Sequence, residues 1–239
     1  ARAAALDAWA WTACGWLSRA EPIGQQMLDT LYTCLIQDAR LGMHAAHALR
    51  VLTLHSRLVS PSRGFVVRRL YRQRTMETML VAVTEALEGR CVAREPCLVA
   101  MATLLPGATD ALVSMHLTTW LPLLVHTLGM DDAPVRLTCA RTLQRIVSSE
   151  HAAALAEHLP LLVPRLLDAA ATPQAPRLRV AALQALQALT DAVPAAHLDA
   201  YRRQVIQALG RPHRGVDDAV RAVRTAAVDC RAAWYATQE

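Results

Sequence analysis

The sequence lacks Lys and Asn altogether and contains a single Phe, Phe65, among its 239 residues. All 25 basic residues are therefore Arg. Because the missing residues use AT-rich codons, we interpret their absence as the imprint of a GC-rich genome. Arg in place of Lys is therefore no indication of phosphate recognition.

Motifs of catalysis and of metal binding are also missing. The chain has no Gly-rich phosphate loop, no H-E-x-x-H and no G-x-S-x-G. His44 and His47 lie three residues apart on a predicted helix, but no carboxylate or Cys completes a ligand set. We therefore predict a protein that is not an enzyme and that holds no metal or cofactor.

The cysteines show no C-x-x-C pair and no zinc-like spacing. Because Cys buries readily, we expect reduced core thiols in a cytoplasmic and nuclear protein. No apolar run reaches membrane-spanning length, and the N-terminus is a poor secretory signal, so we expect no membrane association. The six residues are Cys14, Cys34, Cys91, Cys97, Cys139 and Cys230.

Strand signals are nearly absent, whereas a helical register is repeated along the chain. A Val-Arg or Leu-Arg pair followed three residues later by a small residue recurs at intervals of 43 and 45 residues. A period in the forties is typical of two-helix HEAT repeats. The arginines of these pairs are Arg136, Arg179 and Arg224, to which we assign a structural role between repeats.

Apolar stripes at helical spacing follow each of these arginines and predict buried helix faces. Earlier helix pairs fit at 23–37 with 41–54 and at 75–88 with 93–105, and residues 3–19 form a leading helix. We therefore predict an all-α fold, a right-handed α-solenoid of about five HEAT-type helix pairs plus one N-terminal helix. We expect residues 1–239 to form a single array, the C-terminal fragment of a longer protein, since the leading helix lacks a polar cap.

The interval between the first two repeats is about 52 residues, and the excess falls on an insertion at residues 55–74. Six arginines lie between residues 57 and 74, with no acid among them, and give this segment a charge of +6. Because the net charge of the whole chain is +5, the other residues sum to −1. We predict a basic helix that begins near Gly64, with Leu70 and Tyr71 on its apolar side and its arginines opposite.

Two surfaces are candidates for partner binding. The first is the basic helix, which could be a solvated face, a contact for an acidic protein or a nucleic-acid contact. The second is the last helix, whose polar strip ends in an aromatic pair and could equally be a solvated cap. The candidate residues are Phe65, Arg68, Arg69 and Arg72 on the first surface, and Arg221, Arg231, Trp234 and Tyr235 on the second.

Three segments carry a more specific resemblance: Val66 to Arg74, Arg179 to Thr190, and the stretch from Gln204 through Val223-Arg224 to Tyr235. They are similar to the C-terminal quarter of the HEAT scaffold family first named for methyl-methanesulfonate sensitivity, number nineteen. The resemblance spans about residues 40 to 235.

This resemblance implies a scaffold or adaptor subunit of the cytosolic iron-sulfur cluster targeting complex. It further implies docking of a small targeting subunit beside a WD40 propeller subunit, and delivery of clusters to client proteins such as DNA helicases and polymerases. A cluster carrier would need a set of thiolates, and the scattered cysteines agree with a scaffold that does not ligate the cluster.

The alternative function is a HEAT-repeat scaffold that associates with nucleic acid through the basic helix at residues 63–74. That reading predicts DNA affinity that falls steeply with salt. Only one local basic segment supports it, and we expect the adaptor function without direct nucleic-acid contact.

Overall fold

The structure, a computed structural model, describes residues 2–38, 40–53, 62, 68–89, 93–147 and 149–237. Within these ranges all regular elements are helices and no strand occurs. The predicted all-α helical-repeat fold is therefore confirmed. The chain divides into two compact units, Ala1–Leu112 and Val113–Glu239, and a single array continuous across their boundary stays a prediction.

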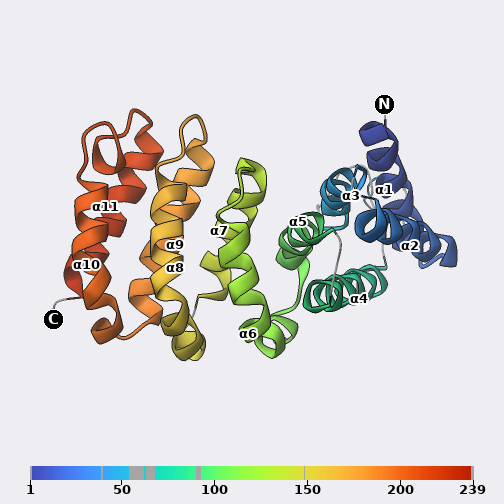
Figure 1. The fold of residues 1–239 in the computed structure, drawn as a ribbon, viewed down its shortest axis with the longest axis horizontal. Coiled ribbons are helices and arrows are strands. Elements are labelled where there is room, and N and C mark those ends of the chain that lie inside the picture. Colours follow the sequence, from blue (N-terminus) through green and yellow to red (C-terminus); the bar gives the residue numbers. More distant parts are fainter. Residues whose placement is uncertain are drawn as a thin grey trace. The chain divides into compact units, whose positions relative to one another are not determined.

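The first unit consists of a leading helix and two helix pairs (Figure 1). The leading helix packs against both helices of the first pair, and the second helices of the two pairs pack against each other. Each overlaps the range that the apolar spacing predicts, although the first helix of the second pair begins before residue 75. The elements are α1 (Arg2–Ser18), α2 (Pro22–Gln37), α3 (Gly42–Leu49) with its 3-10 continuation η1 (Arg50–Leu52), α4 (Arg69–Glu88), and α5 (Arg94–Leu104) with η3 (Leu105–Gly107).

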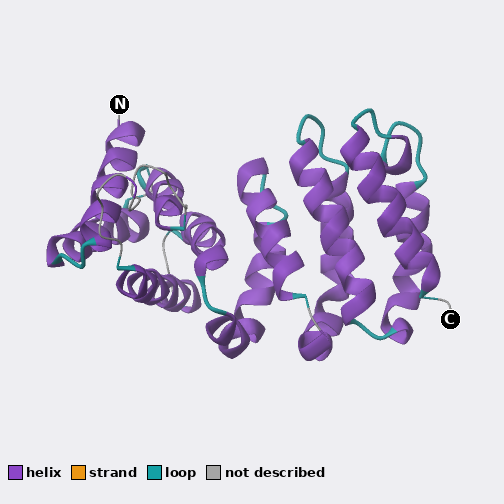
Figure 2. Ribbon diagram, turned by 180° about the vertical axis from the view of Figure 1, so that it is seen from behind, coloured by secondary structure: helices purple, strands orange, loops and turns teal. Residues whose placement is uncertain are grey.

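The second unit holds the remaining helices, which stand side by side and are joined at their ends by loops (Figure 2). The second helices α7, α9 and α11 form a row in which α9 packs against both of the others, and α9 also packs against α8. The elements are α6 (Asp110–Thr127, which begins just before the boundary), α7 (Ala133–Ile146), η4 (Ser149–His151), α8 (Ala152–Ala170), α9 (Pro176–Ala192), α10 (Ala195–Leu209), η5 (Gly215–Asp217) and α11 (Arg221–Ala236).

Proline and aspartate mark where these helices begin. The Asp132 carboxylate accepts a hydrogen bond from the Val135 amide at 3.0 Å and so caps the first turn of α7. Pro134 follows within that turn, and Pro176 opens α9 in the same way. Because the first amides of a helix have no intrahelical acceptor, proline costs nothing at these positions.

The predicted apolar stripes of the second helices form the core of the second unit. All twelve residues are buried, none with more than 5% of its surface exposed. The stripe assignment, made from spacing alone, is therefore confirmed. The residues are Val135, Cys139, Leu143 and Ile146 on α7; Leu178, Ala182, Leu186 and Leu189 on α9; and Val223, Ala227, Cys230 and Trp234 on α11.

The basic segment differs from the prediction. Arg68 is not helical, and α4 begins at Arg69 and continues without interruption to Glu88. A separate basic helix running from Gly64 through Arg74 is therefore wrong, because the last arginines of the cluster form the first turns of α4. Residues 54–61 and 63–67, which include Phe65, lie outside the described residues.

The loop between α10 and α11 depends on one glycine. Gly215 has a φ of +54°, in the left-handed region that disfavours other residues. A Cβ atom at this position would lie 2.2 Å from the Leu209 carbonyl oxygen at the end of α10. The backbone of the loop is therefore seated directly against the end of α10.

We expect Gly215→Ala to lower the free energy of unfolding by about 2 kcal/mol, since it adds a clash to an unfavourable backbone conformation. Urea denaturation measures this change. Gly210→Ala is the matched control in the same loop, because its Cβ would meet no atom closer than 3.4 Å. A control that destabilises the protein as much as Gly215→Ala would contradict this account.

Candidate partner-binding surfaces

A buried arginine links α7 to the next helix pair. Arg136 is 8% exposed, and its Nη2 donates to the Asp168 carboxylate of α8 at 2.7 Å. The carboxylate itself remains 68% exposed. The ion pair therefore joins a helix of one repeat to a helix of the following repeat, with only the arginine removed from water.

Arg179 occupies the corresponding place on α9 and makes two contacts. Its Nη1 donates to the Thr172 carbonyl at 3.0 Å, in the loop before its own helix. Its Nη2 donates to the Asp218 carboxylate at 3.0 Å, in the loop before α11. Both side chains of this ion pair are nearly buried, at 11% and 7% exposure.

Arg224 behaves differently from the other two. It donates to the backbone carbonyls of Asp218 at 2.7 Å and Ala219 at 3.1 Å, both just before its own helix. These bonds lie within one repeat, so the prediction of a direct contact between repeats is wrong for Arg224. Asp218 still connects the two arginines, since its carboxylate accepts from Arg179 while its carbonyl accepts from Arg224.

A fourth member of this register escaped the sequence analysis. Arg94 lies 42 residues before Arg136 and opens α5. Its Nη1 donates to the Leu87 carbonyl, seven residues upstream, at 3.1 Å. Arg179 bonds to Thr172 across the same separation. The repeat interval could have found Arg94, but its Ala-Arg pair did not match the Val-Arg or Leu-Arg pattern.

Trp234 is not available to a partner. Its side chain is fully buried, and its indole nitrogen donates to the Leu186 carbonyl of α9 at 3.0 Å. The prediction of Trp234 as a partner-binding residue is therefore wrong. A buried tryptophan whose indole N–H donates to a neighbouring helix is typical of a residue that anchors the two helices to each other.

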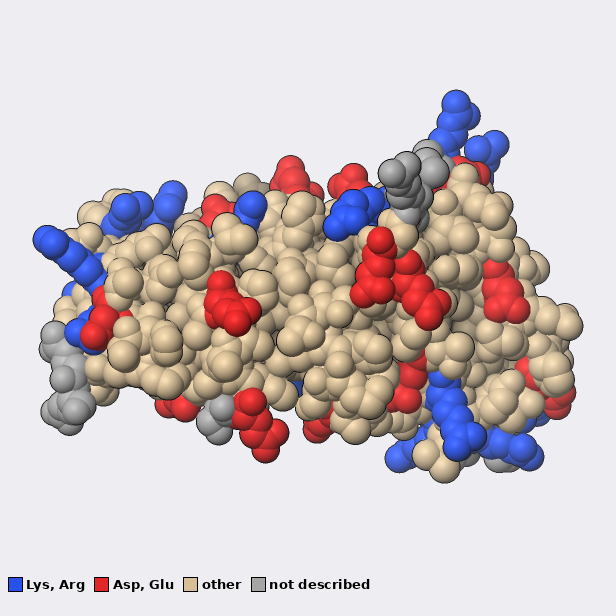
Figure 3. All heavy atoms as spheres, turned by 60° about the horizontal axis from the view of Figure 1, so that its bottom comes forward, with Lys and Arg blue, Asp and Glu red and all other residues tan. Residues whose placement is uncertain are grey.

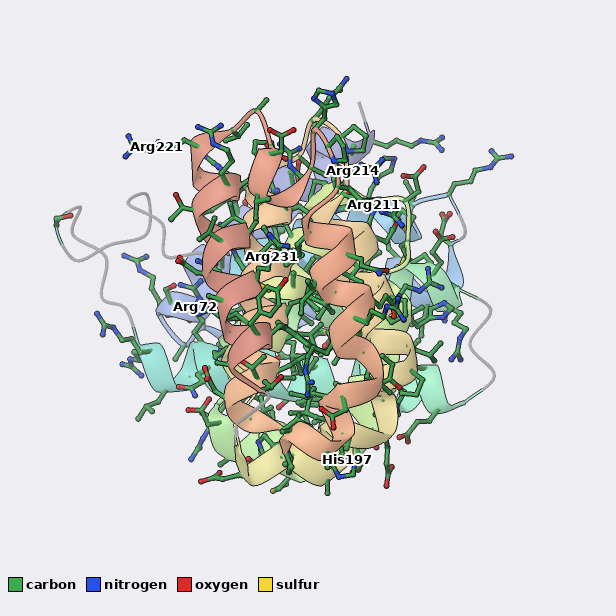
Figure 4. All side chains as sticks on the ribbon, turned by 90° about the vertical axis from the view of Figure 1, so that its left-hand side faces the viewer. Arg72, His197, Arg211, Arg214, Arg221 and Arg231 are labelled. Atoms are coloured by element: carbon green, nitrogen blue, oxygen red, sulfur yellow. The ribbon has the colours of Figure 1, made fainter. Side chains whose placement is uncertain are left out.

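The neighbouring residues of α11 do reach the surface. Arg221, Val228 and Tyr235 lie seven residues apart on one exposed stripe, which we call the α11 strip. Arg231 lies beside it, half-buried, with its guanidinium 5.5 Å from the centre of the Tyr235 ring. In Figure 4, Arg221 projects beyond α11 while Arg231 lies between α11 and α10. The strip offers one cation, one aromatic ring and an aliphatic side chain.

At the start of α4, Arg68 and Arg69 are exposed. The backbone amide of Arg68 donates to the Ser18 carbonyl at the end of α1, at 2.8 Å. This bond fixes the chain at the point where α4 begins. Both guanidinium groups therefore stand on an anchored backbone.

Arg72 points inward, contrary to the prediction. Its Nε donates to the Leu52 carbonyl at 3.0 Å and its Nη2 to the Val51 carbonyl at 3.3 Å. Carbonyls at the end of a helix lack intrahelical donors, which is why a guanidinium turns toward η1. Leu70, predicted on the apolar side, is 78% exposed instead.

This inward turn reduces the basic surface that could follow a phosphate backbone. On the face drawn in Figure 3, the described Arg side chains lie in small groups with acidic side chains between them. A stripe of one charge along a helix would favour nucleic acid. The prediction of Arg72 as a partner-binding residue is therefore wrong. Of the three arginines predicted to contact nucleic acid here, only Arg68 and Arg69 remain exposed.

The structure also contains a groove that sequence reasoning missed. It has a volume of about 540 Å³ and lies between the C-terminal end of α8 and one side of α10, under the loop that follows α10. Arg203, Arg211 and Arg214 line it. No spacing pattern indicated it, because its walls come from segments that only the fold brings together.

The thiols are mostly held in the core. Cys14, Cys97, Cys139 and Cys230 are buried and Cys34 is half-buried. Burial raises the pKa of Cys139 to about 12, with a further contribution from the Asp132 charge. Burial alone raises the pKa of Cys230 to about 12. In Cys14, burial raises the pKa of the thiol despite the nearby Arg72.

Among the described residues, no three His, Cys, Asp or Glu side chains gather closely enough to hold a metal ion. The same residues include no helix with the length and hydropathy needed to cross a membrane.

These features define a helical-repeat protein with arginine contacts at the starts of its second helices. The MMS19 C-terminal family, described as RNAPII transcription regulator C-terminal, matches residues 1–190. Because the match covers well over half of the chain, the chain belongs to this family.

Curated relatives agree with this assignment. The "DNA repair/transcription protein mms19" of Schizosaccharomyces pombe is 27% identical over 97% of this chain and 22% of its own length. The human "MMS19 nucleotide excision repair protein homolog" is 29% identical over 95% of this chain and 22% of its own length. The chain thus spans about a fifth of the length of these relatives.

A solved structure supports the fold. The crystal structure of an engineered protein matches with a TM-score of 0.63, covering 98% of this chain and 90% of its own. Only 14% of the residues are identical, so this likeness concerns the fold alone.

We expect Arg179→Met to lower the free energy of unfolding by about 3 kcal/mol, because it leaves the buried Asp218 carboxylate without its cation. Arg136→Met should cost only about 1 kcal/mol, because water already reaches Asp168. Urea denaturation of both variants beside the wild type measures the two changes. Equal effects, or the opposite order, would show that burial of the acid does not set the cost.

The raised thiol pKa values predict a loss of stability at alkaline pH. Above pH 9 the thiols of the unfolded chain ionise, while Cys139 and Cys230 remain protonated in the folded protein until about pH 12. Unfolded chains therefore release protons first, and stability should fall between these values by up to about 1.4 kcal/mol per pH unit for each thiol.

The measurement is the free energy of unfolding as a function of pH, for the wild type and for the double variant Cys139→Ala/Cys230→Ala. The quantity compared is the slope of this free energy against pH above pH 9. A shallower slope in the variant is expected whatever its absolute stability. Identical slopes would mean that other groups cause the alkaline loss.

Proposed function

We propose that this chain is a scaffold segment of an MMS19-type protein that acts in DNA repair and transcription. The observation that carries the proposal is the family match over residues 1–190. The names of the relatives supply the two processes. Helical-repeat arrays offer extended surfaces for other proteins, which suits a scaffold more than an enzyme.

We further propose that the scaffold serves the cytosolic iron-sulfur cluster targeting complex. In this role it docks the small targeting subunit beside the WD40 propeller subunit and helps to deliver clusters to clients such as DNA helicases and polymerases, in the cytoplasm and the nucleus. The resemblance of residues 66–74, 179–190 and 204–235 to the family scaffold supports this proposal. The cluster is cargo of the complex.

The distribution of cysteines is consistent with a subunit that leaves the cluster to others. Four of the cysteines are buried, and each lies on a different helix: Cys14 on α1, Cys97 on α5, Cys139 on α7 and Cys230 on α11. A cluster requires several thiolates directed at one point. Buried thiols on separate helices suit a structural role.

Docking is assigned to two exposed surfaces. One is the pair Arg68 and Arg69 before and at the start of α4, and the other is the α11 strip. Both are held by neighbouring contacts, so their side chains project from fixed backbone. Arginine and tyrosine are enriched among residues that dominate protein interfaces, which favours these surfaces as docking sites.

The test is a pull-down of the chain with the small targeting subunit and with the propeller subunit, separately and together. We expect the wild type to retain the targeting subunit. Arg68→Glu/Arg69→Glu and Arg221→Glu/Tyr235→Ala should each weaken retention by about tenfold or more, since both reverse charge at an exposed anchor. Arg72 and Trp234 are left unchanged, because their loss would disturb packing.

The control variant is Arg2→Glu/Arg40→Glu, which reverses two charges, as Arg68→Glu/Arg69→Glu does, at two exposed arginines elsewhere. It should bind as the wild type does, and all variants should keep the wild-type melting transition. No retention by the wild type, alone or with the propeller, would overturn the iron-sulfur role. Retention unchanged by both surface variants would remove these surfaces from the docking site.

A further inference from the structure

The lining of the groove beside α10 combines apolar side chains with long polar ones. Ala170 and Ala171 at the end of α8, and Ala200 and Ala208 of α10, are four of the apolar residues in this lining. Four alanines leave room where longer side chains would fill the space between the helices. The result is an open trough of about 540 Å³.

The lining of the groove carries an excess of positive charge. Arg203, Arg211 and Arg214 are exposed and form no ion pair with any described residue. The single acid in the lining, Asp168, already accepts from Arg136. In Figure 4, Arg211 and Arg214 lie on the α10 side of the unit, away from Arg221. Three guanidinium groups therefore line the groove, and its one carboxylate is paired with Arg136.

The loop that carries two of these arginines is held in place. Gly215 seats it against the end of α10, and the His213 amide donates to the Asp217 carboxylate at 2.8 Å. The Asp218 carboxylate accepts from Arg179 and from the Val220 amide. Arg211 and Arg214 therefore start from fixed backbone, which lowers the entropy that a ligand must overcome to order them.

Two amide side chains also belong to the lining. Gln204 and Gln207 project from α10 into the groove, and each can donate and accept hydrogen bonds. Peptide backbone offers donors and acceptors in alternation, whereas a phosphate backbone offers acceptors only. The combination of arginines with amide groups therefore favours a peptide over nucleic acid.

We propose that this groove binds an extended acidic segment of a partner protein. Carboxylates of the segment pair with Arg203, Arg211 and Arg214, and its backbone bonds to Gln204 and Gln207 above the alanines. Arg–carboxylate pairs are charge-assisted and can be bidentate, so they fix orientation as well as affinity. The assignment is independent of the complex that the scaffold serves.

The test uses the full chain and a labelled peptide of alternating Glu and Gly, with fluorescence anisotropy as the readout. The comparison probes are the same peptide with Gln in place of Glu, and a single-stranded oligonucleotide of equal charge. We expect the wild type to prefer the acidic peptide to the neutral one by at least about tenfold.

Two variants separate the groove from general electrostatics. Arg203→Glu/Arg214→Glu should reduce affinity for the acidic peptide by at least about tenfold, while Arg141→Glu/Arg177→Glu, with the same charge change away from the groove, should alter it by less than about twofold. Ala200→Trp fills the groove without changing charge and should also abolish binding. Ala232→Trp, on the exposed side of α11, is its control and should bind normally.

Circular dichroism melting confirms that each variant is folded before its affinity is compared. Equal affinity for the acidic and neutral peptides would overturn the proposal, as would normal binding by Ala200→Trp. Tighter binding of the oligonucleotide, lost in the same two variants, would also overturn it and would make the groove a nucleic-acid site.

Discussion

The ion pair between Arg179 and Asp218 is the interaction on which the second unit most depends. Packing removes both side chains almost completely from water, and neither charge could remain there without the other. The pair ties the start of α9 to the loop before α11. Arg224 adds a bond to the carbonyl of the same aspartate, so Asp218 connects the starts of α9 and α11 with the loop between α10 and α11.

This arrangement explains why a connecting loop can serve as a recognition surface. Loops usually pay conformational entropy when they bind. Here Gly215 and Asp218 fix the loop at both ends of its 3-10 turn, so Arg211 and Arg214 remain oriented in the free protein. On the other side of the same helix pair, Trp234 anchors α11 to α9 and leaves Tyr235 and Arg221 at the surface.

Periodicity predicted the helices and their buried faces, because apolar spacing is a local property that packing then obeys. Periodicity failed where the direction of a side chain depends on a neighbouring element. A helix from Gly64 would place Arg72 on an exposed face, whereas α4 begins at Arg69 and the Arg72 side chain turns inward to the Leu52 carbonyl of η1.

Trp234 shows a different kind of error. It belongs to the buried stripe that the apolar spacing identifies, but it is also half of the aromatic pair that ends the polar strip of the last helix, and the prediction of partner binding rests on that pair. The groove could not be predicted, because Ala171, Arg203 and Arg214 become neighbours only when α8, α10 and the following loop are in place. The Arg register was visible in the sequence, but its acidic partners Asp168 and Asp218 occupy unlike positions in their repeats.

The central claim is that the Arg179–Asp218 pair holds the loop between α10 and α11 in place. Its most direct test is amide hydrogen exchange of residues 213–220 in the wild type and in Arg179→Met. The amides of His213 and Val220, which donate to Asp217 and Asp218, should exchange slowly in the wild type and much faster in the variant, while amides of α10 change little. Unchanged protection of the loop in Arg179→Met would contradict the account.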